Sequence, residues 1–593
     1  MGTIFTRLTK MGGALSTVLV VFSVFALGTE KAFSDMSVPK TTAFCPDPRR
    51  RLSGPVSVAA GDVTQTSAVL WARSTTPGDV VFEYATDPAF GSAVFTATAV
   101  VTDTLQPAKT TLRGLYPGTT YFYRITAGTN VPAVGQFRTA TPAGVHTGLR
   151  FGAAGDWWGS LAPYPSIANA SARQLDFFVE HGDTIVAQRP APAAESLEDY
   201  RLKHDAVYST HLGLNTWGDL RAATSILATI DDNEVRNDFA GGADPASDPR
   251  FDDTGAFINE TQLYRNALQA FQAYNPLRDA FYGATGDPRT ANKRKLYRFN
   301  TYGRDAAIFV LDSRSFRDQQ LPLNDPTNPL QVLSFLTNSL NDTSRTLLGA
   351  QQLADLKADL KQAQAGGITW KFIFTPGPIQ NLGIYHAEDR YEGYAAERTD
   401  LLRFIKQNGI SNVVFVAAGM HGTIVNNLNY QEEPLGEQIP TDAFEVIVGP
   451  VAVDPPFGPA VVDLAEAWGI ITAEERATYD ALDRDEKDAF VGALLDEKLL
   501  APLGYDPVGL DGSPVRSTLL QGGYVAVHTF GWTEFEISPL GQALTVTTFG
   551  IAPYTEAELA AAPDDVIART PAVVSQFVVT PERRLLLPLV IKY

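Results

Sequence analysis

The sequence predicts an α/β (α+β) layered domain preceded by a smaller all-β domain. From about residue 148 onward, short apolar runs alternate with amphipathic segments, which is the pattern of strands covered by helices. Residues 53–142 instead contain β-branched and aromatic runs, separated by turns such as Pro77-Gly78 and Pro117-Gly118. Short strands at this spacing are typical of a β-sandwich.

The larger domain has one clear candidate helix and a series of candidate strands. Leu353, Leu356 and Leu360 recur at three- and four-residue steps within residues 350–362, which predicts a helix. Residues 461–503 predict an inserted helical pair. We expect residues 571–593 to form a C-terminal tail, and for its last residues, 584–593, a docked strand and a sorting tail both remain open. The expected strands are 149–154, 175–180, 226–230, 306–312, 370–375, 412–418 and 443–449.

The smaller domain has two aromatic residues, Trp71 and Tyr121, that we expect to fill its core. Its segment 115–124, with the letters LYPGTTYFYR, resembles the tyrosine corner of fibronectin type III domains. Residues 53–142 are therefore expected to form a fibronectin type III-like domain.

Composition restricts the partners and the chemistry. The net charge is −19 and the pI is near 4.9, which argues against a nucleic-acid backbone or an anionic membrane as the main partner. Cys45 is the single cysteine, so the chain has no disulfide framework and no thiolate cluster for zinc. With only seven histidines, a metal site would depend on carboxylate oxygens, which favour hard cations.

The N-terminus resembles an export signal. Arg7 and Lys10 precede an apolar stretch at 11–29, and cleavage near 32–34 would remove residues 1–36. An uncleaved anchor remains an alternative, because the apolar stretch is near the lower limit for a membrane span. No later segment is long and apolar enough to span, so we expect an exported protein without a span in its mature chain.

Two apolar runs end at a glycine followed by an aspartate. Asp156 follows residues 149–154, and Asp183 follows residues 175–180. The carboxyl ends of parallel strands gather at one edge of a sheet, so these carboxylates are expected to lie side by side. Two close carboxylates repel each other unless a cation or a shared proton neutralises them. A metal centre is the favoured interpretation, and simple helix capping by each aspartate is the alternative.

Two further strand ends extend this set. The segment 231–238, with the letters DDNEVRND, follows the run at 226–230, and His421 follows the run at 413–420. A histidine after a strand is usually structural when it stands alone. Here it is the fourth element of a set, which favours a metal ligand.

With these residues, the chain resembles the PhoD-like alkaline phosphatases and phosphodiesterases within the calcineurin-like metallophosphoesterases. The resemblance also rests on the segments LDSRSFR (311–317), LLGAQQL (347–353), YEGYAAER (391–398) and FEVIVGP (444–450). It covers both domains. It implies a metallophosphoesterase domain over residues 148–570 with a β-sandwich core and the helical insertion at 461–503.

The resemblance also implies roles for individual residues in metal-assisted hydrolysis of phosphate mono- or diesters. Asp183 matches the carboxylate that bridges two metals, Asp156 the first-metal position, and Asp232 a ligand of the third motif. Asn237 is a weaker candidate ligand, and His421 matches the last motif. Arg314 and Arg317 are candidates for phosphate contact, with a structural ion pair as the open alternative for each.

The chain departs from the family pattern at several positions. Its first motif has no cysteine, Val186 replaces a tyrosine, Asn233 replaces the catalytic histidine and Gly419 replaces an aspartate. His181, His386 and Glu234 are available substitutes, although a structural role is the expectation for each. These departures motivate a second hypothesis, in which the protein is an exported binding or surface protein with a degenerate site.

The sequence thus predicts an exported phosphoesterase that acts on a phosphate ester through two or more metal ions. Ca²⁺ and Fe³⁺ are the favoured ions, with Mn²⁺, Zn²⁺ or Mg²⁺ as alternatives. No specific nucleic-acid binding is expected. The sequence does not indicate the natural ester or the oligomeric state.

Overall fold

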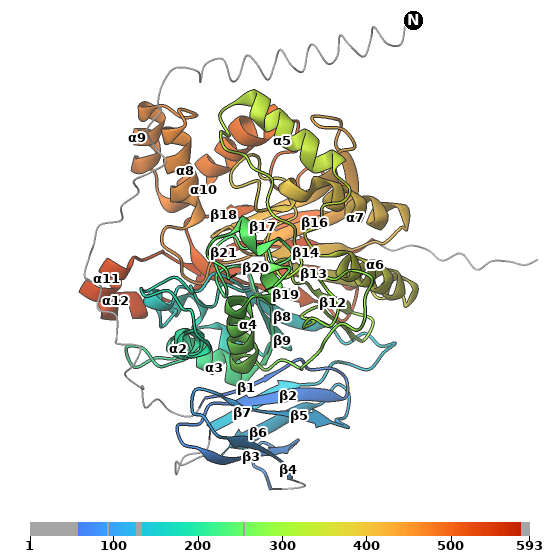
Figure 1. Ribbon diagram of the computed structural model, residues 1–593, viewed down its shortest axis with the longest axis vertical. Helices are drawn as coiled ribbons and strands as arrows, with labels where there is room; N and C mark the ends of the chain where they lie inside the picture. The colour runs from blue at the N-terminus through green and yellow to red at the C-terminus, as the bar shows by residue number, and fades with distance from the viewer. Residues whose placement is uncertain (1–56, 92–93, 126–132, 253–254, 583–593) are drawn as a thin grey trace, which may run out of the picture.

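The computed structural model describes residues 57–91, 94–125, 133–252 and 255–582. These residues form two large sheets with helices on their outer sides, and a smaller β domain lies at one end (Figure 1). The predicted signal segment 1–36 lies outside the described residues. Within the described ranges, no helix has both the length and the apolar character needed to cross a membrane.

The first sheet has ten strands in the order β17-β21-β20-β19-β8-β9-β10-β1-β2-β5. Its central strands β8, β9 and β10 are parallel, and Glu180 of β9 is in register with Ala154 of β8 and Ala228 of β10. The three strands therefore end level with one another. The strands are β1 (Val58–Gly61), β2 (Ser67–Ala72), β5 (Ala108–Arg113), β8 (Leu149–Ala154), β9 (Phe177–Glu180), β10 (Ser225–Ala228), β17 (Ser517–Gly522), β19 (Phe530–Ile537), β20 (Leu544–Ile551) and β21 (Ala572–Val579).

The second sheet has seven strands in the order β11-β12-β13-β14-β16-β15-β18. Strands β12, β13, β14 and β16 are parallel, and β12 and β14 are entirely apolar and buried, as expected for strands that are covered on both faces. The strands are β11 (Arg298–Tyr302), β12 (Ala306–Val310), β13 (Trp370–Thr375), β14 (Val413–Ala417), β15 (Thr423–Tyr430), β16 (Ile439–Ile447) and β18 (Val525–Ala526).

The main core lies between the two sheets and is rich in phenylalanine. The ring of Phe151 stacks between those of Phe177 and Phe535, with centroid distances of 4.7 and 4.9 Å. It also meets the ring of Phe372 of the second sheet edge-on at 4.9 Å. This packing fixes the two sheets face to face, and thereby fixes the strand ends that carry the candidate site.

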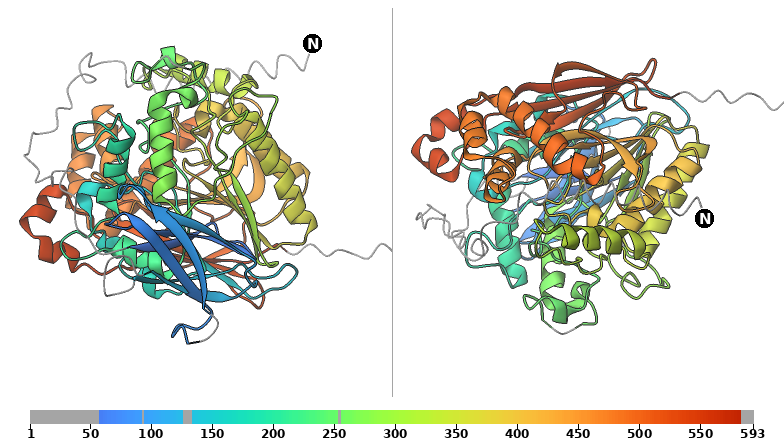
Figure 2. Two further views of the ribbon diagram at one scale, coloured as in Figure 1. Left: turned by 60° about the horizontal axis from the view of Figure 1, so that its bottom comes forward. Right: turned by 90° about the horizontal axis from the view of Figure 1, so that it is seen from above.

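Helices cover the outer face of each sheet (Figure 2). The first sheet is covered by α2 (Leu197–Val207), α3 (Thr216–Ala223) and α4 (Gln262–Tyr274). The second is covered by α6 (Ala350–Ala365), which contains the helix predicted at 350–362, and by α7 (Ala395–Gln407). Helix α5 (Pro329–Asn341) packs on α7.

The small β domain shares a sheet with the large domain. Strand β1 pairs in parallel with β10, with Ala60 opposite Ser225, and this pairing brings β2 and β5 into the ten-stranded sheet. A separate four-stranded sheet completes the domain with β3 (Gly78–Ala85), β4 (Phe95–Val101), β6 (Thr120–Ile125) and β7 (Ala133–Arg138). The two domains are therefore joined by backbone hydrogen bonds as well as by the chain.

The two aromatic residues that we expected in the core of this domain differ in their placement. Tyr121 is buried there, and its Oη accepts a hydrogen bond from the Tyr116 N–H at 2.9 Å. Trp71 is not in that core. It packs with the helices of the large domain, and its Nε1 donates to the Ala273 carbonyl of α4 at 2.9 Å. The prediction for Trp71 is wrong because β2 belongs to the shared sheet, whose other face is covered by the large domain.

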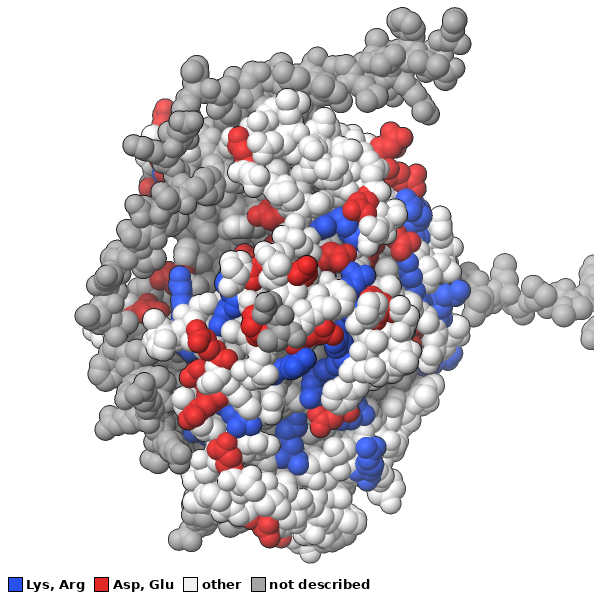
Figure 3. All heavy atoms as spheres, in the orientation of Figure 1, with Lys and Arg blue, Asp and Glu red and all other residues white. Residues whose placement is uncertain are grey.

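The remaining elements follow the second half of the chain. The segment predicted as a helical insertion, 461–503, contains most of α8 (Phe457–Ala467) and all of α9 (Ala473–Ala481) and α10 (Arg484–Leu494). Two short helices, α11 (Glu556–Ala561) and α12 (Pro563–Ile567), precede β21. Strand β21 occupies the first part of the predicted C-terminal tail and pairs with β20 and β17. On the face shown in Figure 3, acidic and basic side chains are interspersed.

Candidate metal centre

The loops that follow β8, β9 and β10 meet at one edge of the first sheet. The Trp157 N–H donates to the Asp183 carbonyl at 2.8 Å, and the Asp156 N–H donates to the Gly182 carbonyl at 3.3 Å. Because the three strands are parallel and end level, their first loop residues come together. Asp156 and Asp183 therefore lie on adjacent loops, as the sequence predicts.

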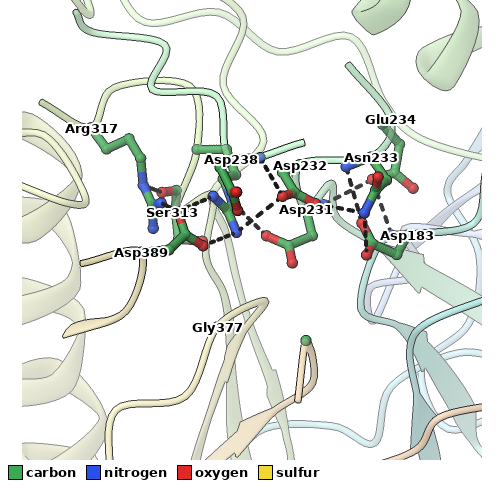
Figure 4. A network of polar contacts seen from close by, with 12 residues as sticks. Asp183, Asp231, Asp232, Asn233, Glu234, Asp238, Ser313, Arg317, Gly377 and Asp389 are labelled. Carbon is green, nitrogen blue, oxygen red and sulfur yellow. Dashed lines mark hydrogen bonds and ion pairs between the residues drawn. The ribbon is translucent and has the colours of Figure 1, made fainter. Parts of the chain in front are cut away.

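The closest carboxylates come from the loops after β9 and β10. Asp183, Asp231 and Asp232 each offer an oxygen, and these oxygens all lie within 4.8 Å of one another (Figure 4). All three residues are buried. Burial raises the pKa of Asp231 and of Asp232 to about 6, and burial together with Asp232 raises the pKa of Asp183 well above its usual value. The cluster thus concentrates negative charge where solvent cannot compensate it.

Asp156 adds a fourth carboxylate to this group of charges. Its Oδ1 accepts a hydrogen bond from the Gly419 N–H at 3.2 Å, whereas its buried Oδ2 has no hydrogen-bond partner among the described residues. Burial and the neighbouring Asp231 raise the pKa of Asp156 well above its usual value. A buried carboxylate oxygen without a donor is costly, and a bound cation would satisfy it.

The backbone at these residues is strained. Asp156, Asp183, Asp238 and His421 have φ angles of 63°, 54°, 55° and 57°. This left-handed conformation is uncommon for residues other than glycine, and such strain gathers at functional sites. Its occurrence in four loops, which follow β8, β9, β10 and β14, supports a functional role for this region.

Two side chains of the loop after β10 hold the carboxylates in place. Asn233 donates from Nδ2 to Asp183 Oδ2 at 2.8 Å and to Asp232 Oδ1 at 2.9 Å. The buried carboxylate of Glu234 accepts from the backbone N–H groups of Asp183, Thr184 and Asp231, at 3.0, 2.7 and 2.9 Å. Glu234 therefore joins the loop after β9 to the loop after β10 through backbone hydrogen bonds.

The two arginines predicted to contact phosphate form ion pairs within the protein. Arg314 donates from Nε to Asp231 at 2.6 Å and binds Asp389 with both terminal nitrogens, at 2.8 and 2.7 Å. Arg317 donates to the Ser313 carbonyl and to Asp389, each contact being close to 3 Å or less, and it is 1% exposed. The ion-pair alternative describes both residues, because Asp389 draws the guanidinium groups together.

Asp389 and Asp238 lie beside the cluster, and an arginine compensates part of their negative charge. Their carboxylates and that of Asp232 also come within 4.8 Å of one another, but the Arg314 guanidinium lies among them, 3.8 Å from Asp232 and 2.7 Å from Asp389. Burial alone would raise the pKa of Asp389, and Arg314 and Arg317 outweigh it and hold that pKa below its usual range.

The remaining predicted ligands lie at the margin. His421 follows β14, outside the closest carboxylate group of the described residues, and burial lowers its pKa to about 4. Its imidazole is therefore neutral, the form that binds metals. Asn237 is exposed and donates to Asp238 at 2.5 Å. Gly419 leaves room for Asp231, because a Cβ at position 419 would come within 3.2 Å of Asp231 Oδ2.

The donor set fits hard cations. Asp156, Asp183, Asp231 and Asp232 supply crowded oxygens, of which the buried Asp156 Oδ2 has no donor, and His421 is a neutral imidazole in the loop after β14. Carboxylate oxygens suit Ca²⁺, Mg²⁺, Mn²⁺ or ferric iron better than soft metals. The carboxylate group could therefore hold a metal ion.

Comparison with known proteins places this centre in a family. The PhoD-like phosphatase profile matches residues 151–486, and the profile of the PhoD-like N-terminal domain matches residues 41–141. The chain belongs to the PhoD-like phosphatase family. As a PhoD-like phosphatase it is a metal-dependent phosphoesterase, and the family's region includes the four aspartates and His421.

Relatives with a PhoD name agree with this assignment. Alkaline phosphatase D of Bacillus subtilis (strain 168) is 27% identical over 421 residues, which is 65% of this chain and 67% of that protein. A solved structure of PhoD aligns with a TM-score of 0.63 and 20% identity, over 88% of this chain and 89% of the other, and shows the same fold. Purple acid phosphatase PPD1 from yellow lupin seeds aligns over 89% of this chain and 74% of its own, with 10% identity and a TM-score of 0.45.

Two residues of this PhoD-like site are not predicted from the sequence. The motif match selects Asp232, whereas in the structure its neighbour Asp231 also follows β10 and also lies in the closest carboxylate group. Asp389 carried no signal at all, because it lies in the loop between β13 and α7, far along the chain from the arginines that it pairs with. Only the folded structure shows their proximity.

Proposed function

We propose that this PhoD-like phosphatase is exported and hydrolyses phosphate mono- or diesters through two or more cations, with Ca²⁺ and Fe³⁺ as the favoured ions. The observation that carries the proposal is the buried group of Asp183, Asp231 and Asp232, together with the unpartnered Asp156 Oδ2. The apolar segment at 11–29 supports export.

The chain's own residues supply the frame for this reaction. The Asp183 carboxylate interacts electrostatically with Asp156 and with the Asp231–Asp232 pair. It would therefore be the residue that contacts both cations. When bound, the cations would withdraw charge from the phosphate oxygens and lower the pKa of the attacking water. His421, in its neutral form, would complete the ligand set from the loop after β14.

The arginines act through the carboxylates in this proposal. Arg314 donates hydrogen bonds to both Asp231 and Asp389, and Arg317 donates one to Asp389. Both are positioning residues. Asn233 takes the place of a catalytic histidine and orients Asp183 and Asp232 through its amide. An amide cannot deliver a proton to a leaving oxygen, so another group has to serve poor leaving groups.

The test is hydrolysis of bis-p-nitrophenyl phosphate and p-nitrophenyl phosphate by the purified protein. Activity should disappear with EDTA and return when Ca²⁺, Mn²⁺ or Fe³⁺ is restored, and the ratio of the two rates ranks diester against monoester. An absence of turnover with every metal would contradict the proposal and favour a binding protein with a degenerate site.

A further inference from the structure

A cavity of about 330 Å³ opens beside the acidic cluster. Its walls include Asp238, Arg250, Gln320, His386, Glu388 and Asp389. The Asp238 N–H donates to Asp232 Oδ2 at 2.6 Å, and Asp389 is tied through Arg314 to Asp231. The cavity therefore shares a wall with the candidate metal centre, and a phosphate ester bound at that centre would extend its ester group into the cavity.

His386 is one of the residues that line this cavity. Its ring packs edge-on against Tyr385 at 4.6 Å, and Tyr385 packs on Phe457 at 5.7 Å. The Phe457 N–H donates to the His421 carbonyl at 2.8 Å. His386 thus lines the cavity next to Asp238 on one side and is connected to the loop of His421 on the other.

The orientation of His386 suits a proton donor. Its Nδ1 lies 3.8 Å from Glu388 Oε1, its side chain is 65% exposed, and its Nε2 has no hydrogen-bond partner among the described residues. Its φ of 47° places it among the strained residues of the site. One ring nitrogen therefore lies near a carboxylate, the residue belongs to the cavity wall, and its exposed side chain can exchange a proton with solvent.

We propose that His386 donates the proton to the leaving oxygen of a phosphodiester whose leaving alcohol occupies this cavity. The inference rests on the proposed function. A water oxygen forms a bond to phosphorus, the bond from phosphorus to the leaving oxygen breaks with its electron pair, and the His386 Nε2 proton passes to that oxygen. The products are a phosphomonoester and a neutral alcohol, and the proton released by the attacking water replaces the one that His386 gave up.

The charges around the cavity indicate the class of alcohol. Arg250 is paired with Asp248 at 2.7 Å, and Asp389 is neutralised by two arginines, so their charges are satisfied within the protein. The carboxylates of Asp238 and Glu388 remain beside the open space. They repel an anionic group and accept hydrogen bonds, which favours an uncharged polyol or a cationic alcohol over a second phosphate.

The decisive experiment compares two leaving groups in His386→Asn. One probe is bis-p-nitrophenyl phosphate, whose leaving group needs little protonation. The other is bis(glyceryl) phosphate, the phosphodiester of two glycerol molecules, whose leaving alkoxide needs a proton. With metal restored, we expect kcat for the glycerol diester to fall about 10²-fold or more while that for the nitrophenyl diester stays within about threefold. His211→Asn is the matched control, because the Nε2 of His211 contacts only the Ala206 carbonyl in the described structure.

The pH profile provides a second readout. Glu388 raises the pKa of His386, and Asp238 adds a smaller effect in the same direction. Partial burial and Arg390 lower this pKa but do not outweigh Glu388. His421 also interacts electrostatically with His386. Because the protonated form is the donor, alkyl-ester turnover should fall as the pH rises past this pKa. Glu388→Gln should move that falling limb to lower pH.

The outcomes separate the two proposals. Equal losses for both esters in His386→Asn, or no loss for either, would overturn the role of His386 and leave the phosphoesterase in place. If the unaltered protein hydrolyses neither ester with any metal, the proposed function itself fails. Faster turnover of an ester with a second phosphate on its leaving alcohol would contradict the cavity assignment alone.

Discussion

Arg314 Nε lies 2.6 Å from Asp231 Oδ1, so a buried arginine holds one carboxylate of the metal centre from behind. The same guanidinium binds Asp389 with its two other nitrogens. One planar group therefore fixes two carboxylates at a set angle, which a point charge cannot do. It also supplies positive charge to a cluster that otherwise repels itself.

Replacing this arginine by lysine tests its positioning role. Arg314→Lys keeps the charge but cannot contact both Asp231 and Asp389, so metal affinity and kcat/KM should each fall about 10- to 100-fold. Titrating activity with added metal separates the two effects. Arg403→Lys is the control, because Arg403 pairs with Glu432 at the surface. Unchanged metal affinity in Arg314→Lys would rule out this role.

Asp183 should be essential to the reaction. Its oxygen lies within 4.8 Å of those of Asp231 and Asp232, and it is the member that belongs to the neighbouring loop. Asp183→Ala should abolish metal-dependent hydrolysis, with a loss of about 10³-fold or more, because charge stabilisation by a metal is worth several kcal/mol. The measurement is EDTA-sensitive turnover alongside bound metal by elemental analysis. Full activity would reject the assigned site.

Glu234 should matter mainly for stability. Its carboxylate satisfies three backbone N–H groups from two loops, and Glu234→Ala leaves them buried without an acceptor. Each unsatisfied donor costs about 1–3 kcal/mol, so the free energy of unfolding should fall by roughly 3–5 kcal/mol. Urea unfolding of the metal-free protein measures this. Glu433→Ala, at an exposed position, should change it by less than about 0.5 kcal/mol, and an equally small effect in Glu234→Ala would contradict the prediction.

The strand ends of this site were predictable because local pattern and topology agree there. A buried parallel strand must be apolar, and the first polar residue after it must lie at the sheet edge, so Asp156, Asp183 and Asp232 could be placed from sequence. The structure puts β8, β9 and β10 side by side with level ends. The fold class follows from the same alternation of strands and helices.

The partners of those residues were not predictable, because they depend on contacts between distant segments. Asp389 lies 75 residues from Arg314 and changes it from a candidate phosphate ligand to one half of an ion pair. Trp71 faces the large domain only because β1 pairs with β10. Neither the Asp389–Arg314 ion pair nor the β1–β10 pairing can be recognised from local composition or periodicity. Residue type alone therefore could not predict the contacts of Arg314 and Trp71.

Glu397, at the start of α7, should make the stability of the protein depend on pH. Its Oε1 accepts from the Leu347 and Leu348 N–H groups at 3.2 and 3.0 Å, and its Oε2 accepts from the Thr346 hydroxyl. Burial outweighs these donors and raises its pKa from 4.5 to about 7. The folded state therefore binds this proton more tightly than the unfolded state, and the stability it contributes below pH 4.5 is lost as the pH rises through 7.

Glu397→Gln isolates this effect, because glutamine can keep Oε1 on both backbone groups and turn its amide toward Thr346. We compare the free energy of unfolding of the variant with that of the unaltered protein. The difference, variant minus unaltered protein, should increase between pH 4.5 and 7 and then level off. At about 1.4 kcal/mol per pKa unit, the total increase should be up to about 3 kcal/mol. Urea unfolding across this range measures it, with Glu433→Gln reporting the behaviour of an exposed site. A difference that stays constant with pH would mean that Glu397 does not titrate in this window, because its hydrogen bonds would then offset its burial.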